Sequence, residues 1–251
     1  MKPVLLLGDS CIDKFVYCDC IRLCPEAPVP LLDVHKVTMN TGMAGNVYQN
    51  LKALQVKTKF FTNSNFKETI KTRYVDNKTN HMFIRIDHTE PHATKFKDYK
   101  DSIRFKDYSA VVMSDYNKGF LTEDDIAFVC KRHPTTFLDT KKRLGKWCQD
   151  VLFIKINRQE FANTESTITE SLRRRIIVTC GGTGAIFRGA TYPVKDVEVK
   201  DVSGAGDSFL AGLVSKYIQA KNIAASIEYA NRCASYVVQR KGVTVVDKNL
   251  V

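Results

Sequence analysis

The sequence contains no apolar run long enough to cross a membrane as a helix. Val4–Leu7 is too short for the hydrophobic region of a signal peptide and predicts a buried strand instead. The eight cysteines include no paired C-x-x-C spacing, and no second cluster completes a four-ligand zinc site with Cys18, Cys20 and Cys24. We therefore expect reduced thiols, no structural zinc ion and a cytoplasmic location.

Other absences narrow the class of protein. The chain shows no internal repeat, no low-complexity tract and no linker, so residues 1–251 are expected to form a single domain. The segment Gly182-Thr183-Gly184 lacks the third glycine of a dinucleotide-binding fingerprint and lies too late in the chain. This argues against an enzyme that uses NAD.

Acidic residues are in the minority, since 38 Lys and Arg face 27 Asp and Glu for a formal net charge of +11. The basic residues are scattered, so most are expected on a solvated surface whose field favours anionic ligands. Nucleic-acid binding is an alternative, but no module for it is visible and the aromatic residues do not interleave with a basic stripe. Small anionic substrates are therefore favoured over nucleic acid.

Strand-like and helix-like segments alternate along most of the chain, which predicts an α/β fold with a mainly parallel sheet and helices on both faces. Asn46–Leu54 has helical spacing, and Gly181–Gly184 predicts a hairpin that adds antiparallel strands late in the chain. The predicted strands are Val4–Leu7, Val56–Phe61, Ala110–Met113, Phe137–Asp139, Val151–Ile156 and Ile176–Val178.

One region departs from this alternation. From Phe15 to Thr38 the sequence is rich in β-forming residues and is interrupted by Pro25, Pro28 and Pro30, which confine strands to sheet edges. A strand near residues 82–87 alternates apolar and polar side chains and is expected to join it. This predicts a small projecting β lid.

The segment Asp201–Asp207 lies between a predicted strand, in which Val197 and Val199 alternate with charged residues, and a periodic helix. A small-residue turn at a helix start leaves backbone N–H groups that attract anions, and Gly204 and Gly206 allow close approach. A carboxylate there suggests a base that takes a proton from a hydroxyl attacking a phosphate. The alternative is that Asp207 merely caps the helix.

Four more segments are expected to follow strands and to meet at the carboxyl edge of the sheet, where α/β proteins bind ligands. Asp13 and Asn46 offer groups for hydroxyls, Lys118 offers a cation, and Glu160 offers a carboxylate for hydrated Mg²⁺. The alternatives are an ordinary turn at Asp13, a solvent-facing Lys118, and a capping box formed by Asn157 and Glu160. The segments are residues 8–13, 41–46, 114–119 and 157–160.

Together these five segments resemble the ribokinase-like carbohydrate kinases, over about Val4 to Val246. The resemblance implies a ribokinase-like three-layer fold, with ATP and Mg²⁺ as cofactors. It implies Asp207 as catalytic base, with Gly204, Ala205 and Gly206 as the anion hole. The other implied positions are Asp13, Gly42 and Asn46 for sugar hydroxyls, Thr179, Gly182, Gly184, Asp201 and Asn231 for the nucleotide cofactor, and Asn157 and Glu160 for magnesium. A monovalent cation near Asp201 is left open.

Within this family the sequence is most similar to heptose-7-phosphate kinases, in residues 8–13, 25–30, 71–73, 84–87, 114–119 and 139–141. This likeness implies ATP-dependent phosphorylation of a hydroxyl, the anomeric one, on a sugar phosphate. It also implies a homodimer formed through the β lid. Arg73, Arg85 and Lys118 would bind the sugar phosphate, although on spacing alone the two arginines would pair with Glu68 or Asp87.

The chain departs from the family in two ways. Met43 stands where these kinases usually have a second glycine, and loops around residues 63–77, 88–108 and 163–173 are expected to be shortened. These departures keep open a catalytically weak ligand-binding protein with a kinase fold. A kinase for another sugar or for a nucleoside is a further alternative.

Overall fold

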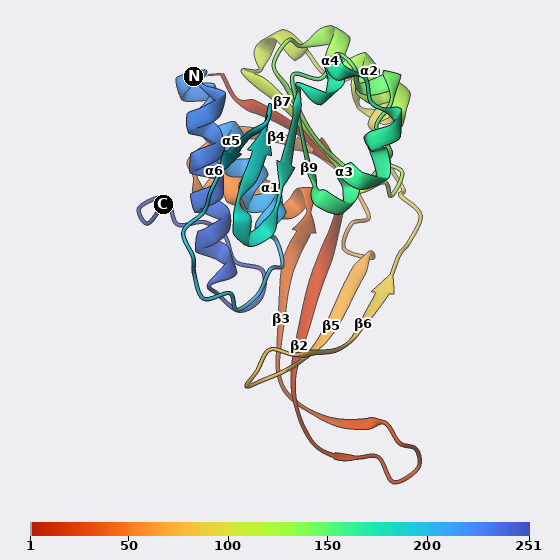
Figure 1. Ribbon diagram of the computed structural model, residues 1–251. Helices are drawn as coiled ribbons and strands as arrows, with labels where there is room; N and C mark the ends of the chain where they lie inside the picture. The colour runs from red at the N-terminus through yellow and green to blue at the C-terminus, as the bar shows by residue number, and fades with distance from the viewer. Residues whose placement is uncertain (1) are drawn as a thin grey trace.

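The computed structural model describes residues 2–251, whose strands form two sheets (Figure 1). The main sheet has eight strands in the order β12-β11-β10-β9-β8-β7-β1-β4. Neighbouring strands pair in parallel except at β10–β11 and β11–β12, which are antiparallel, as the hairpin after β10 predicted. The strands are β1 (Val4–Gly8), β4 (Thr58–Phe61), β7 (Ala110–Asp115), β8 (Thr136–Thr140), β9 (Phe153–Asn157), β10 (Ile176–Thr179), β11 (Ala185–Phe187) and β12 (Ala190–Tyr192).

Helices cover both faces of the main sheet because its central strands are apolar on both sides. In β1, Val4 and Leu6 pack into one core with α1, α5 and α6, whereas Leu5 and Leu7 pack into a second core on the α2 side. All four are fully buried, and each contributes about 1.5–3 kcal/mol to stability. The predicted three-layer α/β fold is confirmed. The helices are α1 (Ala44–Ala53), α2 (Glu123–Arg132), α3 (Arg158–Thr164), α4 (Glu170–Arg173), α5 (Ala205–Ala220) and α6 (Ile223–Val238).

The second sheet projects away from the main one, with the β2–β3 hairpin reaching farthest (Figure 1). Its order is β3-β2-β5-β6, formed by β2 (Ser10–Leu23), β3 (Pro30–Met43), β5 (Ile70–Asp76) and β6 (Met82–His88). Pro25 and Pro28 lie in the turn at the tip, and Pro30 begins β3, so none interrupts a ladder. The strands lie where the sequence predicts extended chain, but they begin before residue 15 and end after residue 38.

Two expectations about local structure are wrong. Residues 70–76 fall within an expected shortened loop, yet they form β5, which pairs with β2 and β6. The alternating stretch at Val197 and Val199 is not a strand, since it pairs with no other strand within residues 2–251. Instead, the N–H groups of Lys200 and Asp201 donate to the carbonyl of Val238 at the end of α6. The alternation arises because both valines line a hollow described below.

No helix formed by residues 2–251 combines the length and the apolar character that a bilayer crossing requires.

Candidate active site

Asp207 lies in the first turn of α5, directly after a tight turn in which Gly204 adopts a left-handed backbone (φ 80°). Its carboxylate is 5% exposed and accepts two hydrogen bonds, from the Asn46 amide nitrogen at 2.9 Å and the Tyr116 hydroxyl at 2.7 Å. Burial raises the pKa of Asp207 to about 6, although those two hydrogen bonds oppose the shift. A carboxylate with such a pKa is ionised at neutral pH and is a competent general base.

A buried ammonium group lies beside the glycine turn. Lys155, in β9, is 4% exposed and pairs with the Asp139 carboxylate at 2.7 Å. Its Nζ atom would lie 2.9 Å from a Cβ atom built on Gly206, so the turn can hold a side chain there only if Lys155 moves. Backbone N–H groups at the helix start and this ammonium group therefore create positive potential at one place.

Tyr116 lies in the segment of residues 114–119, but the sequence analysis predicted no role for it. Besides its bond to Asp207, its ring lies 5.2 Å from the Lys71 ammonium and 5.3 Å from that of Lys141. Lys141 also contacts Glu160 in α3. The site thus contains three lysines that sequence reasoning missed. The available signal was a charged residue, Lys155, inside an otherwise apolar strand.

Asn157 and Glu160 form a reciprocal capping box at the start of α3, so the alternative considered for them is present. A cap does not prevent the Glu160 carboxylate from facing a hydrated ion. Within residues 2–251 no three His, Cys, Asp or Glu side chains gather as a ligand set. These residues therefore fit a Mg²⁺ ion that keeps most of its water ligands and is coordinated by the phosphates of a substrate. They do not fit a site in which protein side chains supply all the ligands.

Asp13 and Gly42 lie on neighbouring strands near the base of the second sheet, where Gly42 pairs with Cys11, two residues before Asp13. Asp13 is in β2, so it is not an ordinary turn residue, and it pairs with Arg73 of β5 at 2.5 Å. A Cβ atom on Gly42 would lie 2.1 Å from Asp13 Oδ2, so the glycine provides the space that this carboxylate occupies. Burial, together with the nearby Asp13 and Asp207 carboxylates, raises the pKa of the Cys11 thiol to about 12.

The three cations predicted for a sugar phosphate lie in different surroundings. Arg73 pairs with Asp13. Arg85 lies directly opposite Arg73 on β6 and pairs with Asp87, which is the alternative predicted from the sequence. The Lys118 side chain is exposed and makes no ion pair or hydrogen bond within the described chain, which is the solvent-facing arrangement considered for it.

A second part of the site is a hollow of about 220 Å³ between the β10–β11 turn and α6. Four of the five predicted nucleotide-binding residues line it, namely Thr179, Gly182, Gly184 and Asn231, and so do Ala205 and Gly206 of the helix start. The fifth, Asp201, lies outside it. Its carboxylate accepts from the N–H groups of Ser203 at 2.8 Å and Gly242 at 3.0 Å. These two hydrogen bonds to Asp201 therefore stabilise the turn that precedes Asp207.

The five segments meet, but not all for the reason expected. Thr41–Met43 end a strand of the second sheet, and no strand precedes Asp201, so the expectation that all five follow strands of one parallel sheet is wrong. They meet because β2 starts and β3 ends at the carboxyl edge of β1. The Ala44 N–H donates to the Asp9 carbonyl at 2.9 Å, and Ser10 pairs with Met43.

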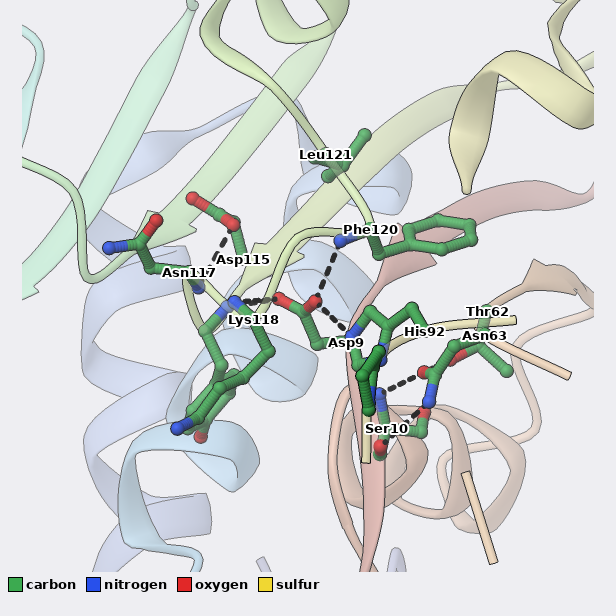
Figure 2. A network of polar contacts seen from close by, with 12 residues as sticks. Asp9, Ser10, Thr62, Asn63, His92, Asp115, Asn117, Lys118, Phe120 and Leu121 are labelled. Carbon is green, nitrogen blue, oxygen red and sulfur yellow. Dashed lines mark hydrogen bonds and ion pairs between the residues drawn. The ribbon is translucent and has the colours of Figure 1, made fainter. Parts of the chain in front are cut away.

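Asp9, directly after β1, organises the loop that carries Tyr116. Its buried carboxylate accepts from the Tyr116 N–H group at 2.7 Å. It also accepts from the Phe120 N–H group at 3.0 Å and from His92 Nε2 at 2.8 Å (Figure 2). Burial acts to raise the pKa of Asp9, but the bonds from His92, Phe120 and Tyr116 outweigh it and hold the pKa below its usual value. Asp9 is thus a fixed negative charge that positions Tyr116.

Replacing Asp9 by asparagine should destabilise the fold by about 3 kcal/mol or more, because it leaves a donor facing N–H groups in a buried site. Since the native pKa is lowered, this stabilisation is present above pH ~4 and is lost as pH falls further. Urea unfolding at pH 7 measures it, with exposed Asp107→Asn as the matched control. A loss no larger than that of the control would contradict this role.

Comparison with solved structures identifies the fold. The structure matches ribokinase of Thermotoga maritima with a TM-score of 0.74 and 15% identity, covering 100% of this chain and 98% of that one. It matches phosphofructokinase-2 of Escherichia coli with a TM-score of 0.73 and 12% identity, covering 99% and 96% of the two chains. At these identities the likeness shows the fold, and the ribokinase-like fold implied by the sequence is confirmed.

The model of the pfkB family carbohydrate kinases matches residues 49–249, and the chain belongs to this family of phosphotransferases with an alcohol group as acceptor. Bifunctional protein HldE of a Nitratiruptor species is 30% identical to it over 293 residues. Bifunctional protein HldE of Helicobacter pylori is 29% identical over 295. Both comparisons cover 96% of this chain, which spans only 63% and 64% of the length of these relatives.

Proposed function

We propose that the protein is an ATP-dependent kinase that phosphorylates a hydroxyl, the anomeric one, of a sugar phosphate such as heptose 7-phosphate. The observation that carries the proposal is the position of Asp207. It is a buried carboxylate with a pKa of about 6, beside a glycine turn that also lines the hollow containing Thr179 and Asn231. The acceptor would lie on the Asp13 side of Asp207 and the nucleotide on the other side.

In this proposal the acceptor hydroxyl attacks the terminal phosphorus of ATP in line with the leaving oxygen, and Asp207 takes the hydroxyl proton. The N–H groups of the turn and the Lys155 ammonium stabilise charge on the transferred oxygens. Mg²⁺, placed by Glu160 through its waters, would neutralise charge on the phosphates. Asn46 and Tyr116 hold the carboxylate in position.

The acceptor's own phosphate would bind near Arg73, Arg85 and Lys118, with Lys71 as a fourth cation of that region. In the register of the second sheet, Arg73 lies opposite Arg85, and Lys71 lies opposite Asp87. Arg73 and Arg85 already pair with Asp13 and Asp87, so a substrate phosphate would share these guanidinium groups with the two carboxylates. We treat these residues as the specificity-determining part of the proposed site.

The direct test is a coupled assay with ATP and a panel of acceptors: heptose 7-phosphate, fructose 6-phosphate, ribose and a nucleoside. Turnover on the heptose phosphate above the other acceptors supports the proposal, whereas preference for another acceptor replaces the substrate. Silence across the panel favours the ligand-binding alternative. One observation motivates that alternative, because Met43 is buried with φ 60° and ψ −133°, a backbone that costs a side chain of order 1–3 kcal/mol.

The pH dependence of turnover tests the role of Asp207. Because a base acts in its ionised form, kcat/KM should fall as pH drops through about 6. Tyr116→Phe removes a hydrogen bond that lowers the pKa of Asp207, so the acid limb should move up by roughly 0.5–1 pH unit. Tyr99→Phe, which loses a hydroxyl bond to Thr94, is the matched control. An acid limb at the same pH in Tyr116→Phe and wild type would contradict the assignment.

We further propose that the second sheet is a lid and that it joins two copies of the chain. Its outer face carries an apolar row across all four strands, made of Val37, Val16, Tyr74 and Ile84 in register. Val37 and Ile84 are 46% and 52% exposed, which is costly unless they are covered. Ile84→Asp should therefore shift sedimentation to the monomer, whereas Leu250→Asp, exposed elsewhere, should not. A wild-type monomer at micromolar concentration would refute the dimer.

A further inference from the structure

A second hollow lies outside the proposed catalytic site. It has a volume of about 780 Å³ and is bounded by α3, α4, β10 and β11. Because side chains alternate along a strand, Ile176 and Val178 of β10 face this hollow. Ile177 belongs to the core on the opposite face, and Thr179 lines the proposed nucleotide hollow. The two hollows therefore lie back to back across one strand, and we call this one the arginine hollow.

Its rim carries four arginines, Arg158, Arg173, Arg174 and Arg188, and one carboxylate, Glu170. Glu170 lies 3.4 Å from Arg174 and 4.0 Å from Arg173, and Arg173 also pairs with Glu165 at 3.2 Å, so two carboxylates serve the four guanidinium groups. The resulting surplus of positive charge is suited to a multiply charged anion. Guanidinium groups donate to phosphate oxygens in pairs, which makes phosphate the best-matched anion.

The floor of the arginine hollow is apolar. It is formed by Ile176, Val178 and Ile186, and Phe161 lies at its side with the Arg173 guanidinium 5.3 Å from the ring. A ligand that carried only hydroxyls and a phosphate would find no hydrogen-bond partner on this floor. A flat heterocyclic base would cover it and could stack between the aromatic ring and an arginine. The volume is also within the range of small-molecule sites.

Arg188 occupies a backbone position that does not favour arginine. It and Gly189 form the two-residue turn between β11 and β12, with φ of 50° and 80°. Hairpin turns with both φ values positive strongly prefer Asn-Gly, because asparagine tolerates this conformation better than a long side chain does. Where a sequence departs from a local preference, a function is a reasonable explanation. Here the departure adds a guanidinium group to the rim.

We propose that the arginine hollow is a second binding site, for a nucleoside phosphate whose phosphate contacts the rim arginines and whose base covers the apolar floor. The proposal does not depend on the kinase reaction, since it concerns residues on the other side of β10. It requires a nucleotide-binding site whose affinity depends on Arg188 and does not depend on Thr179 or Gly182.

Calorimetric titration with ADP tests this, using three variants. Arg188→Asn removes the guanidinium group while improving the turn, so its melting temperature should not fall below that of wild type. Arg104→Asn is the matched control, since that arginine is 71% exposed and does not line the hollow. Gly182→Leu fills the proposed nucleotide hollow, where a Cβ atom on Gly182 meets nothing within 4 Å.

We expect two ADP sites in wild type and in Arg104→Asn, and one site in each of the other two variants. If only the kinase proposal fails, wild type will show one site, which Arg188→Asn weakens at least tenfold and Gly182→Leu leaves intact. Unchanged ADP binding in Arg188→Asn overturns the second site. Ribose 5-phosphate carries the sugar and phosphate of AMP without the base, so it tests the role of the apolar floor. If it binds the Arg188-dependent site as tightly as AMP does, the base does not bind the floor and this part of the proposal is refuted.

Discussion

Asp207→Asn is expected to lower turnover by a factor of roughly 10² or more, the scale of a general-base contribution, while nucleotide affinity stays near wild type. The amide has the same shape and can still accept a hydrogen bond from Tyr116, but it cannot take the hydroxyl proton. Single-turnover measurements at saturating ATP would show this loss in the chemical step. The matched control is Asp124→Asn, an exposed aspartate in the first turn of α2.

The same substitution should also change how stability depends on pH. A carboxyl whose pKa rises from 3.8 to about 6 on folding destabilises the native state at neutral pH, by about 3 kcal/mol if the whole shift is counted. The asparagine variant is free of this cost, but its amide nitrogen faces the Asn46 amide nitrogen and loses that hydrogen bond at every pH. The stability of Asp207→Asn relative to wild type should therefore rise between pH ~4 and ~6 and stay constant outside that range. Near-normal turnover, or a relative stability that stays flat between pH ~4 and ~6, would refute the role of a buried base.

Gly42→Ala is expected to raise KM for the acceptor by roughly 10- to 100-fold, with little change in KM for ATP. The new methyl group would collide with the Asp13 carboxylate and approach the Cys11 sulfur to 2.8 Å, so Asp13 must move and its pair with Arg73 must break. Loss of a hydrogen bond to a charged group is worth about 1.5–3 kcal/mol, which gives this range.

A double-mutant cycle makes this test specific. If Gly42→Ala acts only through Asp13, then Asp13→Ala should raise KM to a similar extent and the double variant should be no worse than either single one. Additive effects would mean that Gly42 contributes in another way, and an unchanged KM in both single variants would remove Asp13 from the proposed acceptor site.

The elements of the main sheet were predictable because each is encoded locally. Runs such as Val4–Leu7 and Ala110–Met113 are apolar over a strand length, and a helical pattern begins after the small residues at Gly204. The strand expected at Val197 is absent because an alternation of apolar and polar side chains shows only that one side of a segment faces an apolar surface. There that surface is a hollow with no neighbouring strand.

The candidate site was only partly predictable. Asp13, Asn46 and Asp207 stand in recognisable motifs, whereas Tyr116 and Lys155 acquire their positions from packing between elements far apart in sequence. The bond from Tyr116 to Asp207 joins residues 91 apart, and the bond from Asn46 spans 161. No local pattern specifies such pairs. The roles of all these residues remain predictions until the variants are measured.

The strands β2 and β3 have a mechanical consequence. Asp13 lies about ten residues from the outer end of β2, a reach of roughly 33 Å, and the β2–β3 ladder is irregular between Tyr17 and Cys18 and between Asp19 and Arg22. On the body side of these irregularities the register is continuous from Tyr17 back to Ser10, which pairs with Met43 where the two strands join the body. A movement of this inner part of the hairpin would carry Asp13 and Gly42 with it, so covering the acceptor and moving the residues that bind it would be one movement.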